Sequence, residues 1–343
     1  MRLLVTGATG FIGSRLALRA QQLGIDVVAT GRAEHDLEIE RLDEVRAAGV
    51  RVEAGLLQDA ALVRRLLDGR NVVIHLAAAQ HESAMPPAYF HSVNVDVVRT
   101  LLEECRAQRI DRFVYGSTMG VYGEASGQLL DEDSAVHPEN PYTRTKLEAE
   151  SLVRGAARDF QTCIVRIAET YGPGDRRLLK LFRAIDRGQF FMIGAGHNRR
   201  QCIHVEDLVR GLLLAAQDPA AVDQTFILAG REVMTTNEMV HGIAAALGRK
   251  PPRVQLPMWP FLIAASVMET TLPPLRIQPP LHSRRLDFFR KSFVFSTAKA
   301  HRLLHFEPQI DFAAGAADTA RWYRDHGLLA ARTASAVTGT ESA

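Results

Sequence analysis

The chain begins with the stretch that decides its fold, Met1-Arg2-Leu3-Leu4-Val5-Thr6-Gly7-Ala8-Thr9-Gly10-Phe11-Ile12-Gly13. The apolar run from Leu3 to Val5 predicts a short buried strand, and the glycines follow it at regular spacing. The pattern from Phe11 to Leu23 indicates a helix that ends at Gly24. Glycines between a strand and a helix let backbone N–H groups and the positive helix N-terminus approach a pyrophosphate. The stretch therefore predicts a βαβ unit that binds a dinucleotide.

The rest of the N-terminal half repeats this alternation of strand and helix. Short β-branched runs predict strands at residues 26–30, 51–54, 72–76, 112–115 and 162–166. Longer amphipathic stretches predict helices at residues 89–108 and 141–159, and a later strand at 224–228 is expected to rejoin the sheet. Such alternation is typical of a parallel sheet with helices on both faces. We therefore predict an α/β fold, a Rossmann-type doubly wound parallel sheet with a smaller, mostly C-terminal substrate-binding domain.

We expect two intimately joined domains, because 343 residues exceed the usual length of one. Residues 1–170 would form the dinucleotide-binding domain, which residues 202–230 rejoin, and residues 171–201 and 231–329 would form the substrate-binding domain. Between residues 251 and 280, prolines and apolar residues follow one another without alternation, which predicts an irregular, partly apolar lid or pocket wall. The small and polar residues 330–343 predict a disordered tail.

The bulk composition is that of an ordinary globular protein. Hydrophobic residues make up 47% of the chain and charged residues 23%, and the formal net charge is +2. This balance argues against a nucleic-acid partner, which requires a basic surface. Cys105, Cys163 and Cys202 are odd in number and widely spaced, so we expect reduced thiols in a cytoplasmic protein. We further expect a small-molecule substrate and a homodimer.

No stretch of the sequence is suited to span a bilayer, since the longest uncharged apolar run, Leu256 to Met268, falls short of about 20 residues. The basic pairs Arg284-Arg285 and Arg290-Lys291 accompany this run and could contact an anionic membrane surface, but we favour a solvated basic face. We expect no metal site, because no ligand spacing recurs around the candidate residues His81, Glu82 and His91.

Three polar side chains in the middle of the chain are suited to move a proton. Tyr142 and Lys146 are four residues apart, so on a helix they share one face. A nearby ammonium lowers the pKa of a phenol from about 10 toward the working pH, which makes Tyr142 a candidate general acid/base. Thr118 follows the predicted strand at 112–115, and open α/β sheets bind ligands at the carboxyl ends of their strands. This set suits proton transfer beside a nicotinamide that moves a hydride.

The end of the second strand indicates which dinucleotide is bound. NAD sites place a carboxylate there for the ribose 2′-hydroxyl, whereas NADP sites place a cation beside the 2′-phosphate. This chain has Thr30-Gly31-Arg32 at that point, with Arg15 near the start of the first helix. We therefore expect NADP(H) in preference to NAD(H). The alternative is that Arg32 is a solvated loop residue and that Glu34 or Asp36 contacts the ribose.

Taken in order, the motifs resemble those of the extended short-chain dehydrogenase/reductase family, which includes nucleotide-sugar epimerases and dehydratases. The resemblance covers residues 1–327 and rests on Gly7-x-x-Gly10-x-x-Gly13, His75-Leu76-Ala77-Ala78, Asn94, Ser117-Thr118-Met119-Gly120-Val121-Tyr122-Gly123, Tyr142-x-x-x-Lys146 and Tyr171-Gly172-Pro173-Gly174-Asp175. It implies that Tyr142 is the acid/base, that Lys146 binds the nicotinamide ribose, and that Thr118 is the hydroxyl partner of the reacting oxygen. Ser117 is the weaker candidate, because the family's hydroxyl stands three residues before Val121.

The resemblance also implies a set of residues around the cofactor. They lie in the glycine turn, at strand ends or on the catalytic helix: Gly7, Thr9, Gly10, Phe11, Ile12, Gly13, Arg32, Leu57, Leu76, Ala77, Ala78, Asn94, Tyr142 and Lys146. Ala77 and Ala78 are small, which lets the backbone approach the cofactor closely. Gly55-Leu56-Leu57 replaces the family's usual Gly-Asp pair, so one contact to the adenine is expected to be weaker. His75, at a strand end, is expected to be structural.

Departures from the family's pattern concern the substrate. The dehydratase branch carries Asp-Glu where this chain has Met119-Gly120, so sugar 4,6-dehydration is not expected. Many nucleotide-sugar epimerases have Asn where this chain has Glu169, and a carboxylate there would repel a pyrophosphate. Arg200 lies in a stretch where nucleotide-sugar enzymes use arginine for the diphosphate, which keeps an epimerase open as an alternative. Met119, Glu169 and Arg200 are therefore the candidate substrate residues.

The carboxyl-terminal sequence resembles the branch related to 3β-hydroxysteroid dehydrogenases. This resemblance is carried by the run from Trp259 to Glu269, by Pro279-Pro280-Leu281 and by the run from Phe293 to Ala300. A proline-broken apolar wall suits a hydrophobic alcohol or ketone, although the same residues could simply pack the small domain. We therefore predict an NAD(P)-dependent oxidoreductase that interconverts a hydroxyl and a ketone on a sterol-like, alkyl or aryl substrate. The alternatives are a nucleotide-sugar epimerase with tightly bound NAD and a non-catalytic cofactor-binding protein.

Overall fold

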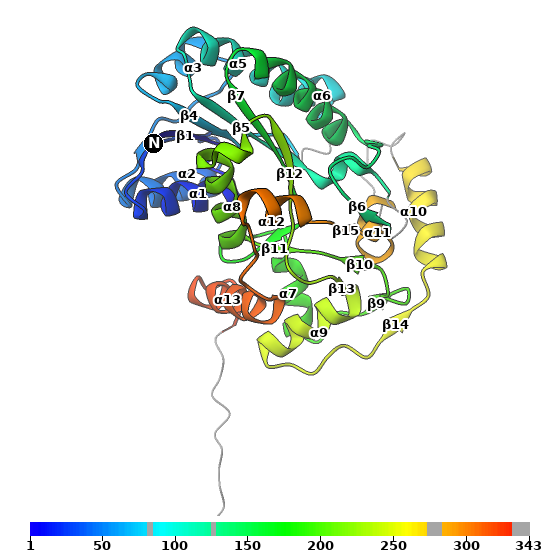
Figure 1. Cartoon of the computed structure of the whole chain (residues 1–343). Helices are drawn as coiled ribbons and strands as arrows, with labels where there is room; N and C mark the ends of the chain where they lie inside the picture. Colours follow the sequence, from blue (N-terminus) through cyan, green and yellow to red (C-terminus); the bar gives the residue numbers. More distant parts are fainter. Residues whose placement is uncertain (81–84, 125–127, 273–282, 331–343) are drawn as a thin grey trace, which may run out of the picture.

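The computed structural model describes residues 1–80, 85–124, 128–272 and 283–330 (Figure 1). The predicted tail falls on residues 331–343 except for its first residue, and so lies outside the described residues. The same holds for His81, Glu82 and the motif Pro279-Pro280-Leu281. A sheet flanked by helices forms one part of the molecule, and a smaller group of helices and short strands lies beside it.

The central sheet has seven strands in the order β12-β7-β5-β4-β1-β2-β3, and all neighbouring strands are parallel. In chain order they are β1 (Arg2–Thr6), β2 (Asp26–Thr30), β3 (Arg51–Val52), β4 (Val72–His75), β5 (Arg112–Thr118), β7 (Gln161–Ile167) and β12 (Gln224–Leu228). Leu3, Leu4 and Val5 are completely buried, as expected of a parallel sheet that is covered on both faces. The predicted doubly wound sheet is confirmed, including β12 as a late addition to its edge.

The strand order places a topological switch point between β1 and β4. From β1 the chain runs outward through β2 and β3, then returns to β4 and runs outward in the opposite direction through β5 and β7. β1 pairs with both inner strands, with Val5 opposite Ala29 on β2 and opposite Ile74 on β4. Ligands of open α/β sheets bind at the carboxyl ends of the strands beside such a point. The glycine turn after β1 therefore lies where a ligand is expected.

Helices cover the two faces of the sheet with two separate apolar layers. One face carries α1 (Phe11–Gln22), α2 (Asp36–Ala47), α8 (Val205–Gln217) and α12 (Ala298–Leu304), and the other carries α3 (Ala60–Leu67), α5 (Val97–Ala107) and α6 (Pro141–Gly155) (Figure 1). Leu16 of α1 and Leu212 of α8 belong to the first buried cluster. Leu101 of α5 and Val153 of α6 belong to the second. Each of these helices thus buries an apolar stripe against the sheet.

A third buried cluster holds the smaller group of elements together. It joins α7 (Leu179–Asp186), α9 (Thr236–Leu247) and α13 (Phe312–Asp325) through side chains such as Phe182, Ile243 and Tyr323. Pairs of two-residue strands accompany the helices: β8 (Thr170–Tyr171) with β11 (Ile203–His204), β10 (Arg199–Arg200) with β13 (Met234–Thr235), β9 (Met192–Ile193) with β14 (Gln255–Leu256), and β6 (Leu129–Leu130) with β15 (Val294–Phe295). The chain leaves the sheet after β7 and returns for β12 before it completes this group.

Several predicted elements differ in extent from those observed. The helix expected over residues 89–108 is divided into α4 (Pro87–His91), a π-helical turn η1 (Ser92–Asp96) and α5. The helix expected to reach residue 159 ends at Gly155 and continues as the 3-10 turn η3 (Ala156–Arg158). The strand expected to end at residue 115 continues to Thr118, while β3 is shorter than predicted. A hydrophobic pattern of helical period does not distinguish a π-helical turn from the α-helix around it.

The expectation of an irregular segment between residues 251 and 280 is wrong for its central part. Trp259–Thr271 form a regular helix, α10, which lies beside α11 (Ser283–Arg290) at the outer edge of the molecule (Figure 1). Pro260 occupies the first turn of α10, where its missing N–H group costs no hydrogen bond. The proline therefore begins a helix instead of breaking one. No helix in the described residues is long and apolar enough to cross a membrane.

Candidate active site

The glycine turn after β1 has no room for side chains. Gly7 has a φ of +75°, and a Cβ atom on it would lie 2.7 Å from the backbone nitrogen of Ala77. A Cβ atom on Gly13 would lie 2.2 Å from the carbonyl oxygen of Gly7. Gly10 precedes α1 and has no side chain that could cap the first N–H groups of this helix. These N–H groups are left for an anionic ligand, so the turn fits the pyrophosphate of a dinucleotide.

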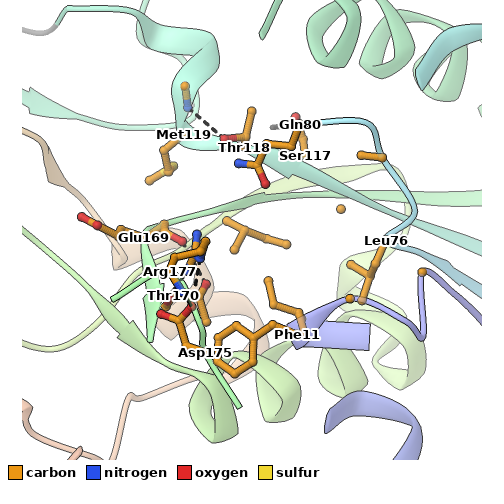
Figure 2. A pocket seen from close by; sticks show the side chains of 18 of the residues that line it. Phe11, Leu76, Gln80, Ser117, Thr118, Met119, Glu169, Thr170, Asp175 and Arg177 are labelled. Atoms are coloured by element: carbon orange, nitrogen blue, oxygen red, sulfur yellow. Dashed lines mark hydrogen bonds and ion pairs between the residues drawn. The ribbon is translucent and has the colours of Figure 1, made fainter. Parts of the chain in front are cut away.

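A cavity of about 610 Å³ extends from this turn across the carboxyl ends of the strands (Figure 2). Predicted residues of all three kinds line it: Gly7, Gly10, Phe11, Ile12, Gly13, Leu76 and Ala78 for the cofactor, Thr118, Tyr142 and Lys146 for catalysis, and Met119, Glu169 and Arg200 for the substrate. The other predicted cofactor residues are not on its wall: Thr9, Arg32, Leu57, Ala77 and Asn94. The fold thus brings the glycine turn and the three polar side chains to one cavity.

Strand β5 places two hydroxyl groups at its carboxyl end, and they have different partners. Ser117 Oγ donates a hydrogen bond to Glu150 Oε1 at 2.6 Å in a buried position. Thr118 Oγ1 accepts one from Gly120 N at 3.1 Å, at the start of the 3-10 turn η2 (Met119–Tyr122). Because Thr118 uses its oxygen as the acceptor, its hydroxyl proton remains to be donated toward the cavity. This difference supports Thr118 over Ser117 as the partner of a reacting oxygen.

The first turn of α6 is fixed by a reciprocal capping arrangement. Asn140 Oδ1 accepts a hydrogen bond from Thr143 N at 3.0 Å, and Thr143 Oγ1 accepts one from Asn140 N at 3.2 Å. Pro141 occupies the first helical position, where a missing N–H group is harmless. Tyr142 therefore projects from a well-fixed turn, and Lys146 follows one turn later on the same face of the helix.

Lys146 is a buried side chain. It is 2% exposed, its Nζ donates a hydrogen bond to Gly116 O at 2.5 Å, and the same atom lies 4.1 Å from the centre of the Tyr115 ring. Burial lowers the pKa of Lys146 from 10.5 to about 7, although the negative charge of Glu150 acts in the opposite direction. Lys146 can therefore change its charge near neutral pH.

An ion pair behind the cavity wall ties α6 to two strands. Glu150 is fully buried, and its carboxylate accepts hydrogen bonds from Ser117 on β5 and from Arg166 on β7, the latter at 3.1 and 2.9 Å. Burial acts to raise the pKa of Glu150, but the hydrogen bonds and charge of Arg166 hold it below its ordinary value. Sequence reasoning missed Glu150. The signal that could have found it is an acidic residue four positions after Lys146 on a helix with one buried face.

Asn94 and His75 support the cavity from behind its wall. Asn94 Oδ1 accepts a hydrogen bond from Ala79 N at 2.8 Å, and its Nδ2 donates to Ala79 O and Thr145 Oγ1, both at 3.0 Å. The π-helical turn that carries Asn94 thus joins the loop after β4 to α6. His75 Nδ1 lies 2.7 Å from Thr6 Oγ1, and burial lowers the pKa of His75 to about 3. His75 is therefore a neutral buried ring, which fits a structural role.

At the end of β2, the predicted discriminator Arg32 is held by its neighbours. Its Nη1 donates a hydrogen bond to the Tyr89 hydroxyl at 3.0 Å. The guanidinium also lies 3.4 Å from the carboxylate of Glu38 and 3.7 Å from that of Glu34. Arg32 is thus not a simple solvated loop residue. Its side chain is 33% exposed, which leaves part of it accessible to a ligand.

Two other arginines near the glycine turn have structural partners. Arg41 of α2 lines the cavity and donates hydrogen bonds to the carbonyl oxygens of Thr9 and Gly174, both at 2.9 Å. It thereby ties the glycine turn to the loop after β8, and no motif in the sequence indicated it. Arg15, near the start of α1, is paired with Glu206 on α8.

An ion pair forms part of the cavity wall among the candidate substrate residues. Arg200 Nη1 lies 2.5 Å from Glu169 Oε2, while its Nη2 donates to Phe288 O at 2.5 Å and its Nε to Thr236 Oγ1 at 3.3 Å. The guanidinium also stacks 4.1 Å from the centre of the Phe288 ring. Figure 2 shows Glu169 and Met119 on the same side of the cavity, away from Leu76. Arg200 therefore meets the cavity with its charge already compensated.

Aromatic side chains complete the wall, although not those of the apolar run at 259–268. Phe293 and Phe295 line the cavity, with ring centres 6.2 Å apart and nearly parallel planes. They belong to the run from Phe293 to Ala300. Among the described residues, none of α10 lines the cavity, so the expectation that this helix forms the pocket wall is wrong. Its apolar side chains pack against α11 or face outward instead.

The described residues contain no group of three or more His, Cys, Asp or Glu side chains that could hold a metal ion. His91, one of the candidates, lies within hydrogen-bonding distance of Asp96 at 3.4 Å and of Glu148 at 3.2 Å. The three cysteines of the chain are buried as free thiols.

A glycine turn at a switch point, with a hydroxyl, a phenol and an ammonium around the same cavity, defines a Rossmann-type enzyme that uses a nicotinamide dinucleotide. Residues 3–229 match the model of the NAD dependent epimerase/dehydratase family. The chain belongs to this family, and with it to the extended short-chain dehydrogenases/reductases. It is an NAD(P)-dependent dehydrogenase/reductase or epimerase.

Relatives with different named activities share most of the chain's length. A dTDP-glucose 4,6-dehydratase of Streptomyces niveus is 30% identical over 341 residues, which cover 95% of this chain and 94% of the relative. A 4-hydroxy-2-methyl-3-oxo-4-farnesyl-3,4-dihydroquinoline-1-oxide ketoreductase of Stigmatella aurantiaca is 30% identical over 299 residues, which cover 83% and 88%. The solved structure of MoeE5 in complex with UDP-glucose and NAD has a TM-score of 0.75 and 26% identity, over 95% of this chain and 99% of that one.

Proposed function

We propose that the protein oxidises a secondary alcohol to a ketone, or carries out the reverse reduction, on a small molecule in the cavity. The observation that carries this proposal is the cavity that Thr118, Tyr142 and Lys146 line together with the glycine turn. A nicotinamide held there supplies or accepts the hydride. A non-catalytic cofactor-binding protein would have no chemical reason to keep all three side chains on the wall.

The protein's own side chains supply the proton chemistry. Tyr142 transfers the proton to or from the reacting oxygen, and Thr118 donates a hydrogen bond to the same oxygen. Lys146 follows Tyr142 by one helical turn, and its ammonium favours the phenolate by charge. Because the pKa of Lys146 is about 7, the readiness of Tyr142 to release its proton depends on pH near neutrality.

A preference for NADP(H) over NAD(H) is part of the proposal, within a family that is NAD-dependent. The partly exposed Arg32 at the end of β2 supports it, because a cation at this place suits a 2′-phosphate. Glu38 and Glu34 support the alternative, NAD(H). Their carboxylates lie 3.4 and 3.7 Å from the Arg32 guanidinium and compensate its charge, and a carboxylate at this place suits the ribose of NAD.

For the substrate, the comparisons favour a nucleotide sugar over the sterol-like compound predicted from the sequence. The family is named for epimerases and dehydratases, one relative is a dTDP-glucose dehydratase, and MoeE5 was solved with UDP-glucose. The first candidate reaction is therefore the oxidation and re-reduction of one sugar carbon, which epimerises it. Met119-Gly120, which provides no carboxylate, argues against sugar 4,6-dehydration.

A specific observation favours a second candidate, an uncharged hydrophobic ketone. Glu169 compensates Arg200 at 2.5 Å within the wall, so the cavity presents a carboxylate beside the cation that a diphosphate would need. Phe293 and Phe295 add apolar surface to the same cavity. The Stigmatella relative is named as a ketoreductase of a farnesylated quinoline oxide, which is a substrate of this kind.

One set of assays separates the two candidates. Purified protein is mixed with UDP-glucose or dTDP-glucose, and separately with alkyl, aryl and sterol ketones, in the presence of NADPH or NADH. Conversion of a sugar to its epimer without net change in dinucleotide absorbance indicates the first candidate. Loss of dinucleotide absorbance with a ketone indicates the second. A folded protein that binds the dinucleotide and turns over neither class contradicts the proposed reaction.

The variant Glu169→Gln adds a test of the wall. It removes one negative charge and keeps the size of the side chain. If the carboxylate excludes diphosphates by compensating Arg200, the variant should bind UDP-glucose more tightly than the wild type, measured by calorimetry. Unchanged or weaker binding would show that the ion pair does not select the substrate.

A further inference from the structure

Helix α10 (Trp259–Thr271) presents apolar residues on two opposite faces. The inner face belongs to a small apolar cluster that includes Met258, Phe261, Leu262, Ala265, Ile193, Leu286 and Phe289. Positions 258, 261, 262 and 265 recur at helical spacing, so they form one stripe that packs on α11 and the strand β9. This stripe accounts for the attachment of α10 to the rest of the molecule.

The outer face of α10 is exposed and equally apolar. Trp259, Ile263 and Val267 are each four residues apart and are 65%, 56% and 54% exposed. Val254 and Phe191, which precede the paired strands β14 and β9, are 57% and 38% exposed. We call these five side chains the α10 face.

An exposed apolar face of this kind needs a partner. A helix that is apolar on all sides is ordinarily buried in protein or placed in lipid, and contiguous apolar patches mark interaction sites. No charged residue lies between Arg253 and Glu269, so the helix carries none of the charges with which surface helices face water. Since no described residue of α10 lines the cavity, substrate binding does not explain the face either.

The segment that carries most of the α10 face is basic, which indicates what covers the face. Residues 249–272 contain three Lys or Arg and one Asp or Glu, whereas the whole chain has 41 and 39. Lys250 and Arg253 are exposed just before Val254. Cations beside apolar side chains that include a tryptophan suit the interface of an anionic bilayer. The apolar groups enter the boundary of the acyl chains there, and the cations meet the headgroups.

We propose that the α10 face docks the protein onto the surface of an anionic lipid bilayer, without spanning it. Figure 1 shows α10 at the outer edge of the molecule, where a flat surface can reach it. A second copy of the chain fits the face less well, because it would bring the same basic segment against itself. This proposal departs from the preference for a solvated basic face, since the neighbouring apolar helix is exposed as well.

The test is sedimentation of the full chain with vesicles of phosphatidylcholine, with or without phosphatidylglycerol. We expect binding to the anionic vesicles that weakens as salt is added, and at least about tenfold weaker binding to the zwitterionic ones. The chain has two tryptophans, so Trp322→Phe leaves Trp259 as the sole tryptophan. Its emission should move to shorter wavelength with anionic vesicles and stay in place with zwitterionic ones.

A matched pair of variants locates the contact. Ile263→Ser with Val267→Ser should weaken vesicle binding at least about tenfold. Leu23→Ser with Ile39→Ser changes two exposed apolar residues elsewhere and should leave vesicle binding intact. Neither pair lines the cavity, so turnover of a water-soluble substrate should be unchanged in both.

Four outcomes would overturn the proposal. The first is no binding to anionic vesicles, and the second is equal binding by the Ile263→Ser, Val267→Ser variant. The third is a doubling of mass with concentration, seen by light scattering and abolished in that variant, which would make the face an interface between two copies. Lys250→Gln with Arg253→Gln should make vesicle binding less sensitive to salt, because two cations near the headgroups are lost. The fourth outcome is therefore vesicle binding by this variant that depends on salt as strongly as that of the wild type.

Discussion

In the proposed mechanism, the proton transfer by Tyr142 is governed near neutral pH by one neighbouring side chain. Lys146, one turn away, has a pKa of about 7 because it is buried, so its charge varies in the working range. His75 has a pKa of about 3 and stays neutral there. The Tyr115 hydroxyl is buried, has no hydrogen-bond partner among the described residues, and burial raises its pKa far above the ordinary value. Of these groups, Lys146 alone can tune Tyr142 by a change of charge.

The replacement of Tyr142 by Phe tests the proposed acid/base. Tyr142→Phe removes one hydroxyl and little volume, so fold and dinucleotide binding should be retained while kcat falls by roughly 10² or more. Tyr115→Phe is the matched control, because it removes a nearby hydroxyl that has no hydrogen-bond partner among the described residues. It should keep most of the activity. A folded Tyr142→Phe variant with near-normal kcat would refute the assignment.

Cofactor choice can be read from one arginine. Arg32→Ala should weaken NADPH binding by on the order of 1.5–3 kcal/mol and NADH binding much less, because a 2′-phosphate forms a charge-assisted contact. Titration with both dinucleotides measures the difference. Arg46→Ala on α2, an exposed arginine that pairs with Asp43, should affect neither. Equal losses for both dinucleotides would mean that Arg32 is no discriminator and would remove the support for NADP(H) over NAD(H).

Among the helices and strands, the position of α6 relative to β5 determines how Tyr142 and Lys146 lie relative to Thr118. The capped first turn fixes Tyr142 along the helix. Glu150 then fixes the helix across the sheet, since it binds Ser117 beside Thr118 and also Arg166 on β7. In the proposed mechanism, Glu150 is therefore a positioning residue, which acts on the reacting atoms through Thr118 and Lys146.

Glu150→Gln should change the pH profile as well as stability. The negative charge of Glu150 raises the pKa of Lys146, so its loss should lower that pKa further and move the alkaline limb of kcat to lower pH. Leaving Arg166 buried without its counter-ion should cost about 3–5 kcal/mol of unfolding free energy.

Ser117→Ala is the control for the Glu150 prediction. It can still be measured if Glu150→Gln does not fold. It removes a hydrogen bond to the same carboxylate but keeps the charge, so the alkaline limb should stay in place. A limb that moves in Ser117→Ala, or that stays fixed in a folded Glu150→Gln variant, would contradict the electrostatic role.

The sequence predicted those parts of the site whose structure depends on residues close together in the chain. The glycine turn, the sheet strands and the start of α6 at Pro141 are determined by apolar runs, glycines and caps within a few residues. Asn94 in its π-helical turn and Arg41 could not be placed in this way, because partners distant in sequence fix their positions. The same holds for helix α10, because its sequence is apolar on both faces and did not indicate which face would pack against α11.

In the whole molecule, the cavity lies where the two parts of the chain meet. The glycine turn, Thr118 and Lys146 come from the sheet and its helices, whereas Arg200 comes from the segment that leaves the sheet after β7. The two parts also share direct contacts, such as the hydrogen bond from Arg41 of α2 to Gly174 O at 2.9 Å. Cofactor choice and substrate choice can therefore change separately in such a molecule, while the reacting atoms stay between them.

The buried Lys146 makes the stability of the whole molecule depend on pH. Its pKa is about 7 in the folded chain against an ordinary value of 10.5, so between these pH values the unfolded chain binds the extra proton. The free energy of unfolding should therefore rise from pH 7 toward about pH 10 through this group. Lys146→Met lacks this dependence. The melting temperature of the wild type relative to this variant should increase over the same range, and a decrease would contradict the lowered pKa.

The position of β12 affects how the chain emerges during synthesis. β7 ends at Ile167, but its outer neighbour β12 begins only at Gln224, after a segment that includes α7 of the smaller group and α8, which covers the sheet. Until that strand leaves the ribosome, the nascent sheet has an open edge on β7 with unpaired N–H and C=O groups. A chain that stalls in this interval is exposed to pairing with another chain and to aggregation. Completion of the sheet thus has to wait for translation of more than half of the protein.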